Sequence, residues 1–209
     1  KDAEEWINEI KADFEKAEDN IQFISSNSDV SFENVWNAKE TLPENIGTWV
    51  YDEKPEVNAV FGPYANGDAF TLAKLHKSEM MPDSVEARHI LLAVTTQAEL
   101  VAAQVLADSL KSMIEGGADF ATLARENSTD QGSAINGGDL GWFKRNQMVK
   151  PFEEAAFTNT SDSVTIVGTQ FGIHLIQTTK RGKLTPQVQV AYLTRNVISS
   201  SKKYQAIYD

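Results

Sequence analysis

The stretch that decides the fold is "NGGDLGWFKRNQMVKPFEEAAF", residues 136–157. It contains a glycine-rich turn, a short Gly-Trp-Phe segment that reads as a strand, and a Lys-Pro step that opens an apolar helix. Proline is favoured in the first turn of a helix, so Pro151 predicts the start of a helix that ends near Phe157. Whether this stretch forms a functional pocket or only a packed corner depends on the elements around it.

The segment "VEARHILLAV" (85–94), upstream of this stretch, predicts a strand. Its side chains alternate, so that Ile90 and Leu92 are expected on one face, and His89 and Leu91 on the other.

Two helices are predicted after this strand. The first opens with a capping box formed by Thr96 and Glu99 and ends at a Gly-Gly pair, residues 116–117. The second, "ADFATLAREN", is expected to bury Phe120 and Leu123. The buried face of the first helix is expected to consist of five apolar residues, Leu100, Ala103, Ala107, Leu110 and Ile114.

Two further strands, at 164–167 and 173–179, are predicted to close the unit, with Gly168 and Gly172 marking the turn between them. The resulting order of elements leaves few connections of the length that parallel strands require. We therefore predict an α+β unit with a mostly antiparallel sheet and helices packed on it.

The segments on either side resemble this unit in diverged form. "NIGTWVYDEKPEV" resembles "GDLGWFKRNQMVKPFEE", so that Pro55 corresponds to Pro151. The strand that begins after Pro186 resembles the one that carries His89, which corresponds to Tyr192. The sequence thus predicts a diverged domain repeat rather than a solenoid, whose period would be about 20–50 residues.

The predicted organisation has three parts. Residues 1–79 form a diverged unit that lacks its opening strand, residues 84–182 form a complete unit, and residues 186–209 are the strand and helix start of a truncated further unit. The strand near 188–194 is predicted to fill the vacancy in the first unit, either within one chain or from a neighbouring molecule, because an exposed sheet edge invites pairing.

Composition narrows the classes of function. The chain has 209 residues and a net charge of −11, which argues against nucleic acid as a partner. Residues 1–79 hold 17 acidic and 7 basic residues, which accounts for −10 of that charge. Cysteine is absent, which excludes disulfides, thiolate nucleophiles and Cys-based metal sites. The sequence contains no run of about 18 apolar residues, so it predicts no membrane span. The charged, helical N-terminus does not resemble a signal peptide. We expect the chain to be a piece of a longer protein.

Four stretches carry a resemblance to a known family. "EARHILLAV", "FATLARENSTD", "GGDLGWFKRNQMVKPFEEAAF" and "GIHLIQ" occur in the order and spacing of the parvulin-type peptidyl-prolyl cis-trans isomerases, over residues 84–182. The flanking units are similar to those of the membrane-anchored periplasmic folding factors of Gram-negative bacteria. The resemblance implies a parvulin-like antiparallel four-stranded sheet with surrounding helices, flanked by a diverged parvulin-like unit.

The resemblance also implies a set of site residues. The catalytic positions it matches are His89, Asp130 and His174. The substrate-binding positions it matches are Leu140, Met148, Phe152, Thr169 and Phe171. Phe171 stands where some members have Ser, which predicts the loss of a hydrogen-bonding group near His174. From the residues alone, plainer roles remain open: the histidines as structural strand residues, Asp130 as a turn or cap residue, and Met148 and Phe152 as core.

The function implied is isomerisation of X–Pro bonds in unfolded or nascent exported proteins, by a non-covalent mechanism that needs no cofactor, metal or phosphate. The chain would act in the periplasm, anchored to the inner membrane through a segment outside this chain, with no membrane contact of its own. The alternative is a non-catalytic holdase chaperone that uses a parvulin fold as a peptide cradle. A hydrolase or a metal site would need a nucleophile or a third ligand, and the sequence offers neither. Residues 1–79 lack matching histidines and a Met/Phe pair, so they are predicted to be catalytically silent.

Overall fold

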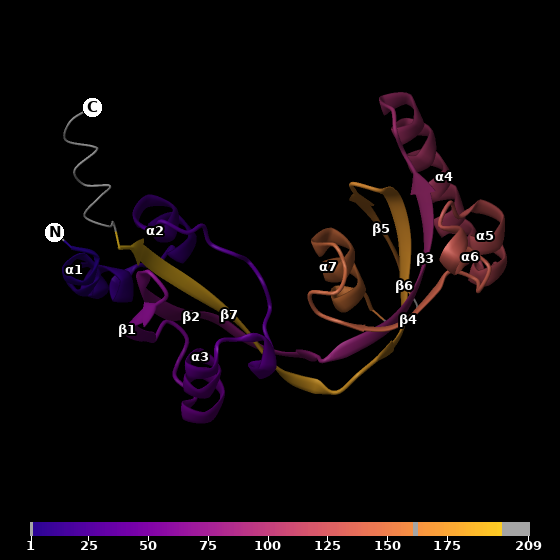
Figure 1. Cartoon of the computed structure of the whole chain (residues 1–209). Helices are drawn as coiled ribbons and strands as arrows, with labels where there is room; N and C mark the ends of the chain where they lie inside the picture. The colour runs from indigo at the N-terminus through magenta and orange to yellow at the C-terminus, as the bar shows by residue number, and fades with distance from the viewer. Residues whose placement is uncertain (1, 161–162, 198–209) are drawn as a thin grey trace. The chain divides into compact units, whose positions relative to one another are not determined.

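The computed structural model describes residues 2–160 and 163–197, and the chain divides into two compact units (Figure 1). The continuous unit consists of residues 80–185. The split unit consists of residues 1–79 together with the chain from Pro186 onward. Each unit has its own sheet and its own hydrophobic cores.

The continuous unit contains a four-stranded sheet in the order β4-β3-β6-β5, in which every neighbouring pair is antiparallel. Its strands are β3 (Ser84–Ala93), β4 (Asp139–Lys144), β5 (Val164–Thr169) and β6 (Gly172–Arg181). Its helices are α4 (Gln97–Glu115), α5 (Phe120–Asn127), α6 (Gln131–Ala134) and α7 (Lys150–Thr158). The α+β class and the antiparallel four-stranded sheet predicted from the sequence are confirmed.

The two faces of this sheet are covered by different helices (Figure 1). Ile90 and Leu92 of β3 pack in one core with residues of α4 and α5. Val85 and Ala87, which point to the other face, pack in a second core with α7. The strand alternation predicted from the sequence is therefore confirmed, and His89 lies on the side of the sheet that α7 covers.

Helix α4 begins as predicted, with Thr96 and Glu99 in a capping box. Of its expected buried face, Ala103, Ala107 and Leu110 are buried, but Leu100 is 36% exposed, so the prediction for Leu100 is wrong. Leu100 lies near the start of α4 and is not part of the core that Ala103, Ala107 and Leu110 form with the sheet.

The split unit contains a three-stranded sheet in the order β1-β2-β7. Its strands are β1 (Val60–Asn66), β2 (Ala69–Pro82) and β7 (Leu184–Asn196). Its helical elements are α1 (Ala3–Lys16), α2 (Asn20–Asn27), η1 (Lys39–Thr41), α3 (Glu44–Thr48) and η2 (Trp49–Glu53). One core packs α1 and α2 against Leu72 and Leu193, and the other packs α3 and η2 against Ala73 and Val190.

Strand β7 lies beside β2, within the same chain and in the same sheet as residues 1–79. Two contacts fix the end of this pairing: the Val197 amide donates to the carbonyl oxygen of Asp68 at 2.7 Å, and Thr71 and Thr194 join their hydroxyls at 3.1 Å. The helix start that the sequence predicts after this strand lies outside the described residues.

A glycine contact fixes the glycine-rich turn against β3. Gly138 has φ +83°, and a Cβ added there would lie 2.2 Å from the carbonyl oxygen of His89. In return, the His89 amide donates to the carbonyl oxygen of Gly138 at 2.8 Å. Only glycine tolerates both this conformation and this approach, so the turn sets the position of the strand that carries His89.

We predict that Gly138→Ala lowers the free energy of unfolding by about 3 kcal/mol or more, because it adds a backbone clash to the cost of a positive φ. The matched control is Gly141→Ala, which has φ +66° but nothing within 4 Å of the added Cβ. That change should cost only about 1–2 kcal/mol. Urea unfolding of both variants measures the difference, and equal losses would contradict the contact.

Candidate active site

His89 and His174 come from the two central strands of the continuous unit. In the β3–β6 register His89 is opposite Ile176 and Leu91 is opposite His174, so the two histidines are diagonal neighbours on one face. Their Nδ1 atoms lie 3.2 Å apart and their rings stack with centroids 5.4 Å apart. Both side chains are buried, at 5% and 4% exposure. The register brings together two residues that are 85 positions apart in the sequence.

Asp130 and Ser133 extend the contacts of His89. The Asp130 Oδ2 atom lies 2.8 Å from His89 Nε2 and accepts a hydrogen bond of 2.6 Å from the Ser133 hydroxyl. Its Oδ1 atom accepts from the Gly132 amide at 3.2 Å, as the N-cap of α6. Asp130 is therefore both a cap residue and a partner of His89, and its carboxylate remains partly exposed.

Thr169 extends the contacts of His174 on the other side. Its hydroxyl lies 2.8 Å from His174 Nε2 and accepts a hydrogen bond from the Phe171 amide at 3.1 Å. The side chain of Phe171 offers no hydrogen-bonding group, and His174 Nε2 has the Thr169 hydroxyl as its partner in the same hairpin.

The hydrogen bonds join the two rings in one chain. A carboxylate only accepts, so Nε2 of His89 carries the proton that it shares with Asp130. When His174 donates from Nδ1 to Nδ1 of His89, its Nε2 accepts from the Thr169 hydroxyl. The donors then run in one direction from the Phe171 amide to Asp130, through a neutral His174.

The electrostatics favour this neutral chain. Burial, together with the charge that His89 would carry, lowers the pKa of His174 from 6.5 to about 4, and the Asp130 carboxylate only partly opposes this. Hydrogen bonds from Ser133 and His89 lower the pKa of Asp130 below its usual value. At neutral pH the site therefore holds one carboxylate and a neutral His174.

A cavity of about 380 Å³ opens in front of this chain of hydrogen bonds. His89, His174 and Asp130 form its polar side. The sequence-predicted residues that line the remainder are Leu140, Met148, Phe152 and Phe171. Phe152 presents its ring edge-on to both histidines, with centroids 5.6 and 5.3 Å away. Thr169 contributes through His174 instead of lining the cavity.

Sequence reasoning did not assign a site role to four residues that the structure brings here. Leu91, Gln147 and Val149 line the cavity, and Ser133 holds Asp130. Leu91 carried a usable signal, since the strand alternation places it on the face of His89. The other three had none: Gln147 and Val149 lie in the loop between β4 and α7, and Ser133 lies in the short helix α6, whose position is set by tertiary contacts.

A buried ion pair holds the loop that carries Met148. Arg145 and Glu153 are 3.4 Å apart and both are under 10% exposed. Glu153 also accepts a hydrogen bond from the Asn146 amide, and the Arg145 guanidinium lies 4.1 Å from the centre of the Phe157 ring. These contacts tie the loop between β4 and α7 to the helix, and so position Met148 at the cavity.

Among the described residues, no group of three or more His, Asp or Glu side chains could hold a metal ion. Over the same part of the chain, none of the helices combines the length and apolar character needed to cross a membrane.

The chain is similar to a known protein family, to curated proteins and to solved structures. A family model described as a PPIC-type PPIase domain matches residues 70–182, more than half of the chain. The chain is 37% identical over 163 residues to "Chaperone SurA" of Polaromonas sp., a match that covers 72% of this chain and 34% of that protein. It is 43% identical over 88 residues to "Foldase protein PrsA" of Geobacillus sp., covering 42% of this chain and 32% of that protein. The chain thus spans about a third of the length of these curated relatives. The crystal structure of the peptidylprolyl isomerase PrsA from Bacillus anthracis has a TM-score of 0.44 at 30% identity, and the match covers 50% of this chain and 44% of that one.

The lowered pKa of His174 predicts a pH-dependent stability. Between pH 6.5 and about 4 the unfolded chain binds a proton at this residue that the folded chain does not, so the free energy of unfolding falls as the pH falls. Over this window the free energy of unfolding falls by about 3 kcal/mol in total because of His174. We expect His174→Gln, which cannot titrate, to be less stable than wild type at pH 7 but to lose less stability over this window. Urea unfolding at a series of pH values tests this, and parallel pH profiles would contradict it.

Proposed function

Because this chain belongs to the PPIC-type PPIase family, we propose that residues 84–182 catalyse cis–trans isomerisation of peptide bonds that precede proline. The observation that carries the proposal is the shared cavity: the hydrogen-bonded side chains of His89, His174 and Asp130 face an apolar wall across it. An apolar socket beside one carboxylate suits a proline residue, because its uncharged ring is attached to a polar amide.

The reaction breaks no covalent bond, so the site needs neither a nucleophile nor a proton transfer. Its barrier is about 18–20 kcal/mol, because the amide loses its resonance when it twists. A catalyst acts by binding the twisted amide better than either planar form. In the proposed mechanism the proline ring sits among Leu140, Met148 and Phe152, which fix one side of the bond and exclude water from it.

Asp130 has a defined part in this mechanism. The planar amide places partial negative charge on its carbonyl oxygen, and the twisted amide places less there. An ionised carboxylate beside that oxygen disfavours the planar form more than the twisted one. His89 and Ser133 hold Asp130 in place and keep it ionised. The two histidines are positioning residues, and the Thr169 hydroxyl holds the His174 ring at Nε2.

The substrate does not need a phosphate in this proposal. A phosphate before proline requires Lys or Arg side chains to bind it. None of the described residues that line the cavity is Lys or Arg. The site therefore suits unmodified X–Pro segments, with little demand on neighbouring residues.

The proposed clients are unfolded or nascent exported proteins that contain X–Pro segments, and the proposed location is the periplasm. The names of the two relatives, a chaperone and a foldase, support an assisting role in folding. The proposed anchor to the inner membrane would lie in a segment outside this chain. We further propose that the split unit is a diverged, catalytically silent parvulin-like unit, which the strand after Pro186 completes.

We predict that Met148→Ala lowers kcat/KM for an unphosphorylated X–Pro peptide about tenfold or more, because it removes part of the proline socket. Met113→Ala is the matched control, since Met113 is 47% exposed on α4 and does not line the cavity. NMR exchange spectroscopy measures the isomerisation without a coupled protease. Equal rates for the two variants would contradict the socket. No acceleration by wild type, with unfolded clients still protected from aggregation, would favour the holdase alternative.

The charge of Asp130 is tested by Asp130→Asn, which keeps the shape and, through its amide oxygen, the cap on Gly132, but removes the charge and the oxygen that accepts from His89 and Ser133. We expect kcat to fall about tenfold or more. Asp119→Asn is the control, because Asp119 caps α5 in the same way and lies outside the cavity. Unchanged kcat in Asp130→Asn would show that Asp130 acts only as a cap.

A further inference from the structure

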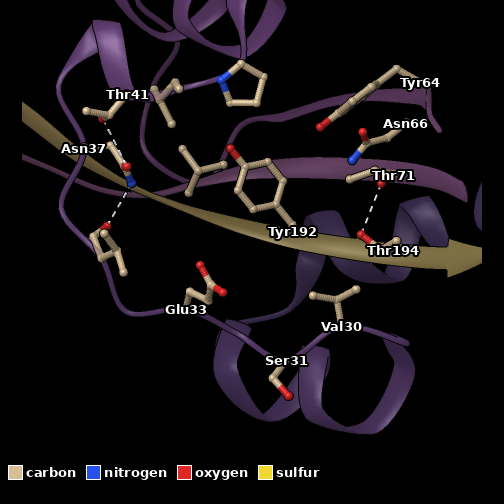
Figure 2. A pocket seen from close by; sticks show the side chains of 14 residues that line it. Val30, Ser31, Glu33, Asn37, Thr41, Tyr64, Asn66, Thr71, Tyr192 and Thr194 are labelled. Atoms are coloured by element: carbon tan, nitrogen blue, oxygen red, sulfur yellow. Dashed lines mark hydrogen bonds between the residues drawn. The ribbon is translucent and has the colours of Figure 1, made fainter. Parts of the chain in front are cut away.

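The split unit contains a cavity of its own, of about 350 Å³ (Figure 2). Its walls come from the segment after α2, from the start of α3, from the β1–β2 hairpin and from β7. Its aromatic and polar members include Tyr64, Tyr192, Asn66 and Glu33. All of its lining residues belong to the split unit, so it is a feature of that unit alone.

This cavity occupies the same place in the split unit as the candidate active site does in the continuous unit. The β1–β2 hairpin and the β5–β6 hairpin have the same two-residue turn and the same register over the first three pairs beyond it; between Phe61 and Tyr64 the first hairpin has a register shift that the second lacks. Tyr64 is opposite Thr71 in the first hairpin, and Val167 is opposite His174 in the second. Thr71 therefore stands where the continuous unit has His174.

The third strand completes the correspondence. β7 lies beside β2 as β3 lies beside β6, and Thr194 contacts Thr71 as Leu91 faces His174. Two residues before Thr194 in the chain is Tyr192, at the position of His89. The cavity is therefore a second version of the same cleft, in which Tyr192 and Thr71 stand at the positions of the paired histidines and Thr194 stands at that of Leu91.

The elements that cover the two clefts also correspond. Leu42 and Pro43 line this cavity just before α3, as Met148 and Val149 line the other just before α7. The space is retained in both units, although the groups that could act on an amide are absent among the described residues of this one. The two units thus share a cavity with room for an extended chain, and they differ in the side chains that line it.

Three polar groups in this cavity are available to a ligand. Among the described residues, the phenol groups of Tyr64 and Tyr192 and the carboxylate of Glu33 make no hydrogen bond or ion pair to another side chain or to the backbone. Burial raises the pKa of Tyr64 to about 12. Burial, with the nearby Tyr64 and Glu33, raises the pKa of Tyr192, so both phenols stay neutral.

We propose that this cavity is a second, non-catalytic site that binds the side chain of an Arg or Lys residue within an extended polypeptide. The Glu33 carboxylate and the phenolic oxygens accept hydrogen bonds from a cationic head, and the tyrosine rings favour a cation beside their faces. The apolar part of the wall, formed by Val35, Leu42 and Val190, suits the alkyl stem of such a side chain.

The charge of the unit supports this choice of ligand. Residues 1–79, which supply most of the cavity, carry 17 acidic and 7 basic residues. A surplus of negative charge attracts basic segments and repels acidic ones. The site would thus hold basic stretches of a polypeptide without acting on them, independently of the isomerase activity proposed for the continuous unit.

The test uses the 209-residue chain and a labelled, proline-free peptide, Gly-Ser-Val-Arg-Ala-Ser-Gly. Its twin carries citrulline in place of Arg, which keeps the shape and removes the charge. We expect fluorescence anisotropy at low salt to give a dissociation constant about tenfold lower for the Arg peptide. Glu33→Gln should remove most of that preference, whereas Glu18→Gln, at an exposed carboxylate outside the cavity, should leave it intact.

Three results would overturn the proposal. The Arg and citrulline peptides could bind equally, or Glu33→Gln and Glu18→Gln could reduce the preference by the same amount, which would indicate general charge attraction. Met148→Ala could abolish peptide binding, which would move it to the other cavity. Because Glu33 is exposed, thermal unfolding of Glu33→Gln should match wild type, and its rate in the isomerase assay should be unchanged.

Discussion

The pairing of β3 with β6 is the interaction on which the candidate active site depends. It is antiparallel and continuous from Ala87 to Ala93, and it sets His89 and His174 diagonally on one face. A register slip of one residue would turn one histidine to the opposite face. Glycines protect this register: a Cβ at Gly172 would lie 2.2 Å from the carbonyl oxygen of Leu92, and Gly138 makes the corresponding approach to His89. The backbone contacts thus position the side chains before any side-chain hydrogen bond forms.

The hydrogen-bonded chain from Thr169 to Asp130 follows from this register and from burial. Two buried imidazoles that share one hydrogen bond cannot both be charged at modest cost, and the lowered pKa of His174 reflects this. With His174 neutral and the pKa of Asp130 lowered, the cavity wall carries the Asp130 carboxylate as a fixed negative charge. An apolar cavity with one fixed charge is suited to binding a distorted amide and unsuited to covalent chemistry. The proposed isomerase mechanism uses this property and no other.

The two units use one arrangement of strands for different chemistry. In both units a hairpin with a two-residue turn lies beside a third strand, and a cavity lies over the same positions of these strands. In the continuous unit the positions hold histidines joined by hydrogen bonds. In the split unit they hold a tyrosine and threonines, with a carboxylate at the rim. The two cavities therefore lie over the same strand positions and differ in the side chains that line them, and the two proposed binding roles rest on that difference.

The sequence by itself determined the local elements and the types of residue at the site. Alternation in β3, the Thr96 capping box and the turn residues depend on neighbours a few positions apart, and these predictions are confirmed. The motif positions of His89, Asp130 and His174 could be read as well. Local pattern failed at Leu100, which is 36% exposed. Only the tertiary structure decided which nitrogen of His89 and His174 meets which partner, and that these side chains share a cavity wall. The meeting of the two histidines depends on the register between strands that place residues 85 positions apart side by side, and a pattern of neighbouring residues carries no information about that register.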